Sequence, residues 1–209
     1  MRVKHIWVAV TALLLALAVL PVFAAEEPPE DPLIGETGWG QACVRAMLLH
    51  YEGKLQVGMV SGGELSALGI SPKVGEIPDW DRLKDLMFVQ VEISGKDLLT
   101  ALERSVKYHP RKNANLLHLQ GVKVLCARSG ETNKILRATI DGKPIEPDKI
   151  YDIAATQFLA EGGGPFVGLK SLRIITKTPN SLAKQLRFLL FPRGKVAPPE
   201  PSYVFSAGE

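Results

Sequence analysis

The chain has 209 residues, of which 46% are hydrophobic and 22% are charged, so it is long enough for one domain with a substantial core. Its formal net charge is +3, and loss of the N-terminal segment described next would remove Arg2 and Lys4 and leave about +1. The overall charge therefore gives no indication of a nucleic-acid or anionic-membrane partner, and we expect no nucleic-acid partner.

The first residues have the pattern of an export signal. A basic start is followed by an almost wholly apolar run over residues 6–19, and Val22-Phe23-Ala24 offers a cleavage site. We expect a cleaved signal peptide over residues 1–24, cut after Ala24 or Ala25, a periplasmic or secreted location and no stable membrane anchor after cleavage. The alternative is an uncleaved anchor, but Pro21 and the acidic, proline-rich stretch that follows favour cleavage.

The rest of the chain divides into three predicted parts. These are a linker over residues 25–36, a domain over residues 37–196 and a flexible tail over residues 197–209, where the composition turns proline-rich. Cys43 and Cys126 match no metal-binding spacing. Export would permit a disulfide between them, and two buried free thiols are an equal alternative.

Hydrophobic periodicity predicts helices over residues 41–51, 96–108 and 181–191, and a helical turn near Asp79 or Asp81. The second helix has the clearest apolar stripe. Strands are predicted over residues 55–60, 88–93, 116–119, 122–127, 135–140, 150–156 and 172–175, with a tight turn at Asp141-Gly142. Helices and strands interleave without strict βαβ alternation, which predicts a single α+β domain with a mixed β-sheet and packed helices.

The strand over residues 150–156 leads into Phe158, which is followed by a glycine triplet at residues 162–164 and by Phe166. This stretch resembles the motif Tyr-x-Val-Ala-x-Asn-x-Phe-Leu-Ala-x-Gly-Gly-Asp-Gly-Phe in the C-terminal, substrate-binding domain of the 5'-nucleotidase family. Further pieces resemble the same domain in order and spacing, at residues 42–49, 59–63, 88–102, 119–122 and 141–145. The resemblance covers nearly the whole chain after the signal and implies this domain without its metallophosphatase partner domain.

In that family, two Phe rings hold the nucleobase between them by stacking. One ring falls on Phe158, whereas Lys84 takes the place of the other. Phe158 has an alternative interpretation as a core aromatic at a strand end, and Lys84 is either a solvated lysine or a contact for an anion. The other candidate ligand-binding residues are Gly62, Gly63, Gly162 and Gly163, which backbone geometry alone would also explain.

Several polar contacts of the family site are missing. The family's Asn-x-Gly-Gly-x-Arg motif has Val60 and Leu65 at its two polar positions here, and its ribose-binding Asp and the next Gly align with Gly164 and Pro165. The resemblance therefore implies a degenerate nucleotide site. The basic residues considered as replacements for the lost anion contact are Arg45, Lys73 and Arg82.

The sequence contains no catalytic motif of a metallophosphatase, such as Asp-x-His, Gly-Asn-His-Asp/Glu or His-x-His, and no P-loop or Gly-x-Ser-x-Gly motif. His50, His109 and His118 are isolated, and we expect them to be surface or partly buried side chains. We expect no catalytic residue, metal site or cofactor in this chain, and divalent metals only in a partner phosphatase.

Two functions stay open. The chain could recognise a nucleotide or a related phosphoester in nucleotide catabolism, with a separately encoded metallophosphatase as its partner and a nucleoside-like small molecule as its ligand. The alternative is a non-catalytic binding or assembly module that keeps the fold. The sequence alone leaves open whether the chain takes part in hydrolysis.

Overall fold

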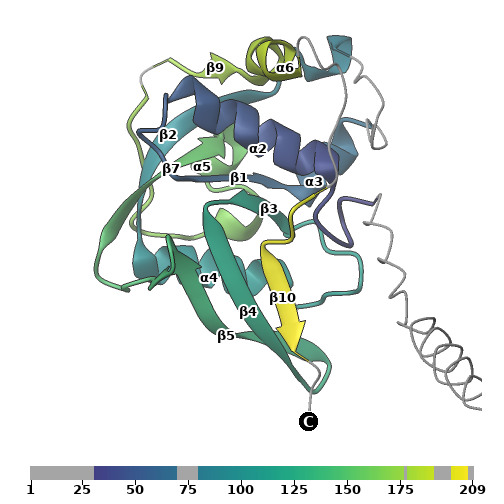
Figure 1. The fold of residues 1–209 in the computed structure, drawn as a ribbon, viewed down its shortest axis with the longest axis vertical. Coiled ribbons are helices and arrows are strands. Elements are labelled where there is room, and N and C mark those ends of the chain that lie inside the picture. The colour runs from purple at the N-terminus through teal and green to yellow at the C-terminus, as the bar shows by residue number, and fades with distance from the viewer. Residues whose placement is uncertain (1–30, 70–79, 177, 191–198, 207–209) are drawn as a thin grey trace, which may run out of the picture.

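A computed structural model describes residues 31–69, 80–176, 178–190 and 199–206 (Figure 1). Its α-helices are α2 (Gly38–His50), α3 (Gly62–Ala67), α4 (Gly95–Val106), α5 (Gln157–Ala160) and α6 (Leu182–Leu190), with short 3-10 helices η1 (Asp81–Leu83) and η2 (Gly164–Phe166). Its strands are β1 (Val57–Ser61), β2 (Met87–Ser94), β3 (Leu117–Gln120), β4 (Val122–Ser129), β5 (Thr132–Ile140), β6 (Lys143–Pro144), β7 (Ile150–Thr156), β8 (Arg173–Ile174), β9 (Asn180–Ser181) and β10 (Tyr203–Ser206).

The larger of two sheets has six strands in the order β3-β1-β7-β2-β8, and β9 also pairs with β2. β1 and β7 are parallel, with Met59 opposite Ala155. β2 is antiparallel to β7, with Phe88 opposite Thr156. The carboxyl ends of β1 and β7 and the amino end of β2 therefore lie together at one end of this sheet.

Both faces of the larger sheet carry hydrophobic side chains, because successive residues of a strand point to opposite faces. On one face, α2 and α6 pack against a cluster that includes Val60 and Phe88. On the other face, α4 and the second sheet pack against a cluster that includes Val91 and Ile153. The larger sheet thus lies between two hydrophobic cores and contributes side chains to both.

The second sheet has the strand order β10-β4-β5-β6. β4 and β5 form a hairpin with an irregularity at Leu125 and Cys126. One face of this sheet is buried, through residues such as Val124 and Cys126, in the same cluster as α4. Figure 1 shows β4, β5 and β10 side by side in front of α4.

Local signals fix where the predicted elements begin. α4 follows Ser94, whose hydroxyl accepts a hydrogen bond from the Asp97 N–H at 3.2 Å, and α2 follows Thr37, which accepts from the Gly40 N–H at 3.0 Å. The predicted α+β fold is confirmed, with the strands divided between two mixed sheets.

The prediction of a flexible tail over residues 197–209 is wrong for the part that the structure describes. Tyr203–Ser206 forms β10, which pairs with β4 in parallel. The Tyr203 side chain is buried, its hydroxyl donates to the Leu117 carbonyl at 3.0 Å, and Ser105 Oγ lies 2.7 Å from the same hydroxyl. The proline-rich composition concealed a strand whose partners lie far away in the sequence.

The linker predicted over residues 25–36 is wrong at its end, since Glu36 is buried in the domain. The Glu36 carboxylate accepts hydrogen bonds from the N–H groups of Leu119 at 2.9 Å and Ser202 at 2.6 Å. Two segments that lie far apart in the sequence are therefore joined by one carboxylate.

Both cysteines, Cys43 and Cys126, are buried free thiols, which decides between the two alternatives. The predicted signal over residues 1–24 lies outside the described residues. Among the residues described, no helix has the length and apolar character needed to cross a membrane.

Candidate functional site

The parallel strands β1 and β7 each pass directly into a helix at the same end of the sheet. Ser61 caps α3 and Thr156 caps α5, and the Glu64 carboxylate joins the two caps. Glu64 Oε2 accepts from Ser61 Oγ at 2.9 Å and from Thr156 Oγ1 at 2.8 Å. Burial raises the pKa of Glu64, and this effect outweighs that of the hydrogen bonds from Thr156 and Ser61, which lower the pKa. This network holds the two helix starts together.

Phe158 lies on α5, directly after this junction, and its side chain is 50% exposed. The ring rests against the glycine loop, because a Cβ atom added to Gly163 would lie 2.5 Å from the ring. The Gly163 N–H also donates to the Phe158 carbonyl at 2.9 Å. The interpretation of Phe158 as a core aromatic is therefore wrong, and its ring offers an open face at the end of β7.

Asn115 lies at the same glycine loop, and no motif in the sequence marked it. A Cβ atom added to Gly164 would lie 3.6 Å from the Phe158 ring and 3.9 Å from Asn115 Oδ1. The Asn115 N–H donates to Asn113 Oδ1 at 3.0 Å, but its side-chain amide has no hydrogen bond within the described part of the chain. No sequence motif marks Asn115, since only the fold brings the start of β3 to the glycine loop.

Gly62 and Gly63 serve the packing of the backbone. Their N–H groups donate to the carbonyls of Leu116 at 2.7 Å and Ala114 at 3.0 Å. A Cβ atom at Gly62 would overlap the Pro32 carbonyl oxygen, so only glycine fits there. The first N–H groups of α3 are thus already bound to backbone carbonyls. Leu65, at the family's arginine position, is fully buried in the core with α2.

Of the basic residues considered for an anion site, the structure describes the side chains of Arg45 and Lys84, and neither makes a cation–π contact with Phe158. Lys84 precedes β2 at the same end of the sheet, and its exposed side chain makes no hydrogen bond or ion pair with the described residues. Arg45 is exposed on α2. Lys73 and the side chain of Arg82 lie outside what the structure describes.

The three histidines lie in separate places. His50 Nδ1 lies 3.1 Å from Gln185 Nε2, and the His109 ring stacks on Phe205 with 4.0 Å between centroids. His118 is fully buried, so the expectation of a surface or partly buried side chain is wrong there. The described residues contain no group of three His, Cys, Asp or Glu residues able to hold a metal ion.

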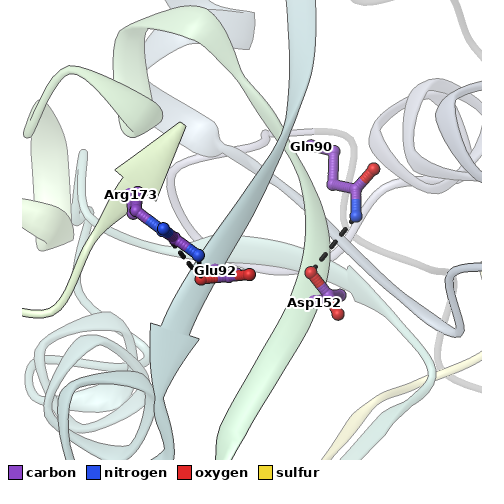
Figure 2. A network of polar contacts seen from close by, with 4 residues as sticks. All are labelled: Gln90, Glu92, Asp152 and Arg173. Carbon is purple, nitrogen blue, oxygen red and sulfur yellow. Dashed lines mark hydrogen bonds and ion pairs between the residues drawn. The ribbon is translucent and has the colours of Figure 1, made fainter. Parts of the chain in front are cut away.

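A second polar group lies on β2, β7 and β8 of the larger sheet (Figure 2). Glu92 on β2 faces Asp152 on β7 across the strand pair, an arrangement of like charges that destabilises a sheet. Figure 2 shows how neighbours relieve it, because Arg173 binds Glu92 and the Gln90 amide donates to Asp152 at 3.2 Å. The four side chains satisfy one another, and we assign them to the stability of the sheet.

Comparison with known families decides the membership of the chain. The family model described as the 5'-nucleotidase C-terminal domain matches residues 30–171. The chain belongs to this family. The match includes the glycine loop, Phe158 and Asn115, and it ends before α6 and β10. No curated protein sequence matches the chain.

Solved structures show the same fold at low sequence identity. A 5'-nucleotidase precursor from Thermus thermophilus has a TM-score of 0.67 and 18% identity, with 85% of this chain and 37% of that chain covered. The NAD nucleotidase NadN of Haemophilus influenzae has a TM-score of 0.56 and 10% identity, with 88% and 36% covered. The Thermus thermophilus sulfate thiohydrolase SoxB has a TM-score of 0.54 and 18% identity, with 82% and 32% covered. The chain thus spans about a third of these proteins.

Chemically, the described site offers one half-exposed aromatic ring and one amide at the same glycine loop. An aromatic face binds flat heterocycles through stacking and apolar burial, and an amide both donates and accepts hydrogen bonds. The fully buried Leu65 offers no charge to a phosphate. The arrangement suits an uncharged planar group better than a phosphate.

Proposed function

We propose that this chain is exported and supplies substrate recognition to a separately encoded metallophosphatase. It holds the flat, nucleoside-like part of a phosphoester while the partner, with its own divalent metals, performs the hydrolysis. The observation that carries the proposal is the half-exposed Phe158 ring, fixed against Gly163 at the end of β7. The signal-like start of the sequence supports export, as does the description of the Thermus thermophilus relative as a precursor.

The buried Leu65 sets the expected ligand preference. Loss of one partner of a charged, hydrogen-bonded pair costs about 2 to 5 kcal/mol, so a phosphate adds little affinity without a guanidinium. Binding energy then comes from the heterocycle on Phe158 and from the Asn115 amide. We expect adenosine and AMP to bind with similar affinity, and inorganic phosphate not to bind.

Calorimetric titration of the purified chain with adenosine, AMP, UDP-glucose and phosphate tests this proposal. Stacking of a base on an aromatic ring contributes about 1 to 3 kcal/mol, so Phe158→Ala should weaken adenosine binding about 5- to 150-fold. The matched control is Phe188→Ala, which removes a phenyl ring that is 79% exposed on α6. The control should bind as the wild type does.

The alternative function, a non-catalytic binding or assembly module, predicts a different result. If no nucleoside or nucleotide binds, or if Phe158→Ala and Phe188→Ala bind equally well, the recognition function is overturned. The replacement of the family's arginine by the core residue Leu65 is the observation that favours this alternative.

A further inference from the structure

The outer face of the second sheet is exposed and carries a distinct set of side chains. Along β4, Val124 and Cys126 point into the core, so Lys123 and Leu125 point to the opposite face. Leu125 pairs with Arg137 on β5 and with Val204 on β10. In Figure 1 this strand group lies in front of α4, and no described helix lies in front of it.

The charged side chains that β4 and β5 present on this face are all basic. Lys123 is opposite Thr139 and Arg137 is opposite Leu125, so the two residues are diagonal neighbours, whose Cα atoms lie about 7 to 8 Å apart in a sheet. Lys134 extends the row opposite Ala127. Glu131 and Asp141 lie beyond the ends of the strands, and Asp141 and Glu200 border a separate depression at the Lys123 end of the row.

Arg137 makes no ion pair within the described part of the chain, and the Lys123 ammonium donates only to the Pro201 carbonyl, at 2.9 Å. Two neighbouring cations that are in no ion pair repel each other. An anion placed between them would therefore be attracted by both.

Aliphatic side chains lie between and beside these cations. Val204 is 56% exposed and Leu125 is 37% exposed, and they are direct neighbours across the β4–β10 pair. Leu136 is 60% exposed at the irregularity of the hairpin. A depression of about 360 Å³ is lined by Lys123, Val124, Leu125, Arg137, Thr139, Gly142 and Val204. Its composition, apolar with cations at the rim, suits a molecule that is both anionic and apolar.

We propose that this face, defined by Lys123, Leu125, Lys134, Arg137 and Val204, attaches the chain peripherally to an anionic phospholipid surface. Lipid phosphates lie at Lys123 and Arg137, and the aliphatic side chains enter the boundary between head groups and acyl chains. A second copy is a poor occupant, because a two-fold contact places cations against cations. The whole chain has too little net charge for this attraction, which arises from the local grouping of Lys123, Lys134 and Arg137.

Vesicle co-sedimentation of the chain without its apolar residues 1–24, the form that the proposed cleavage leaves, tests the proposal. The vesicles are phosphatidylglycerol mixed with phosphatidylcholine, and phosphatidylcholine alone. Each basic residue near an anionic surface increases partitioning about fivefold, so three of them predict about 100-fold stronger binding to the phosphatidylglycerol vesicles at about 10 mM salt. Binding should fall strongly at about 1 M salt, where charges are screened within about 3 Å.

Two pairs of variants locate the surface. Arg137→Glu changes the local charge by two and should weaken binding about 25-fold, whereas Lys184→Glu on the exposed side of α6 should not. Leu125→Ser should weaken binding, whereas Phe188→Ser, which also removes an exposed apolar side chain, should not. Circular dichroism confirms that each variant is folded.

Several outcomes overturn the proposal. Equal binding to both kinds of vesicle would show that lipid charge does not drive the attachment. If Arg137→Glu binds vesicles as the wild type does, the binding surface lies elsewhere on the chain. Loss of binding in millimolar free phosphate, at matched ionic strength, shows a site for soluble phosphate instead of a membrane surface. Binding to neither kind of vesicle at low salt would refute attachment to a membrane, and an acidic protein would then be the better candidate partner for this face.

Discussion

Gly163 sets the position of the Phe158 ring. An added Cβ would lie 2.5 Å from the ring, so Gly163→Ala must push the ring away. Gly163→Ala should lower the free energy of unfolding by about 1 kcal/mol. This is at the low end of the range for overpacked substitutions, because the half-exposed ring can turn toward water. Adenosine binding should weaken as it does in Phe158→Ala.

A double-mutant cycle in urea isolates this contact. In the Phe158→Ala background the clash is absent, so Gly163→Ala should cost nothing there. Equal costs in both backgrounds would show that the two residues act independently.

His118 makes the stability of the fold depend on pH. Its ring is buried, with Nδ1 accepting from the Thr37 N–H at 3.2 Å and Nε2 lying 3.2 Å from the Pro32 carbonyl. Burial lowers the pKa of His118 from 6.5 to about 4, so the unfolded chain takes up a proton before the folded chain does. The stabilisation of the folded state by neutral His118 is therefore complete above pH 6.5 and is lost as the pH falls to 4.

Comparison with His118→Gln isolates this contribution, because burial raises the pKa of Glu36 and Glu64, whose effects on stability have the opposite sign. The difference in unfolding free energy between wild type and His118→Gln should change by about 3 kcal/mol between pH 6.5 and pH 4. Chemical denaturation at each pH measures it. A difference that does not vary with pH would show that His118 is not held neutral.

At the scale of elements, β10 depends on one buried phenol. The Tyr203 hydroxyl donates to the Leu117 carbonyl, and Ser105 Oγ lies 2.7 Å from it. Tyr203→Phe leaves both groups buried with one partner fewer and should lower the free energy of unfolding by about 1 to 3 kcal/mol. The matched control is Tyr108→Phe, whose side chain is 41% exposed and which should change little. Equal effects in urea denaturation would refute the role of this hydroxyl.

Elements with a strong local pattern were predictable from the sequence, and elements held by distant contacts were not. α4 was predicted from its apolar stripe, and β7 was predicted from its run of buried residues. α3 was missed because two glycines open it, although Ser61 and Glu64 form a capping box with the expected spacing. β10 pairs with β4, far away in the sequence, so no local pattern marks it. In the site, the motif identified Phe158, but neither its exposure nor the nearness of Asn115 follows from spacing.

At the scale of the whole molecule, the larger sheet couples two hydrophobic cores. β1, β2 and β7 each contribute side chains to both clusters, so neither core can open without disturbing the same strands. We therefore expect one cooperative unfolding transition for the described domain. Leu102 lies in the cluster with α4 and Leu186 in the cluster with α2, and both are fully buried.

The variants Leu102→Ala and Leu186→Ala test this coupling. Each should cost about 2 to 5 kcal/mol, because each leaves a cavity in a packed core. The fluorescence of Trp39, which is buried in the cluster with α2, should report on that core, and far-ultraviolet circular dichroism reports on the whole fold. Since the strands are shared, both signals should change at the same urea concentration in both variants. If Leu186→Ala shifts the tryptophan transition ahead of the dichroism, the core with α2 unfolds by itself, and the sheet does not transmit stability between its two faces.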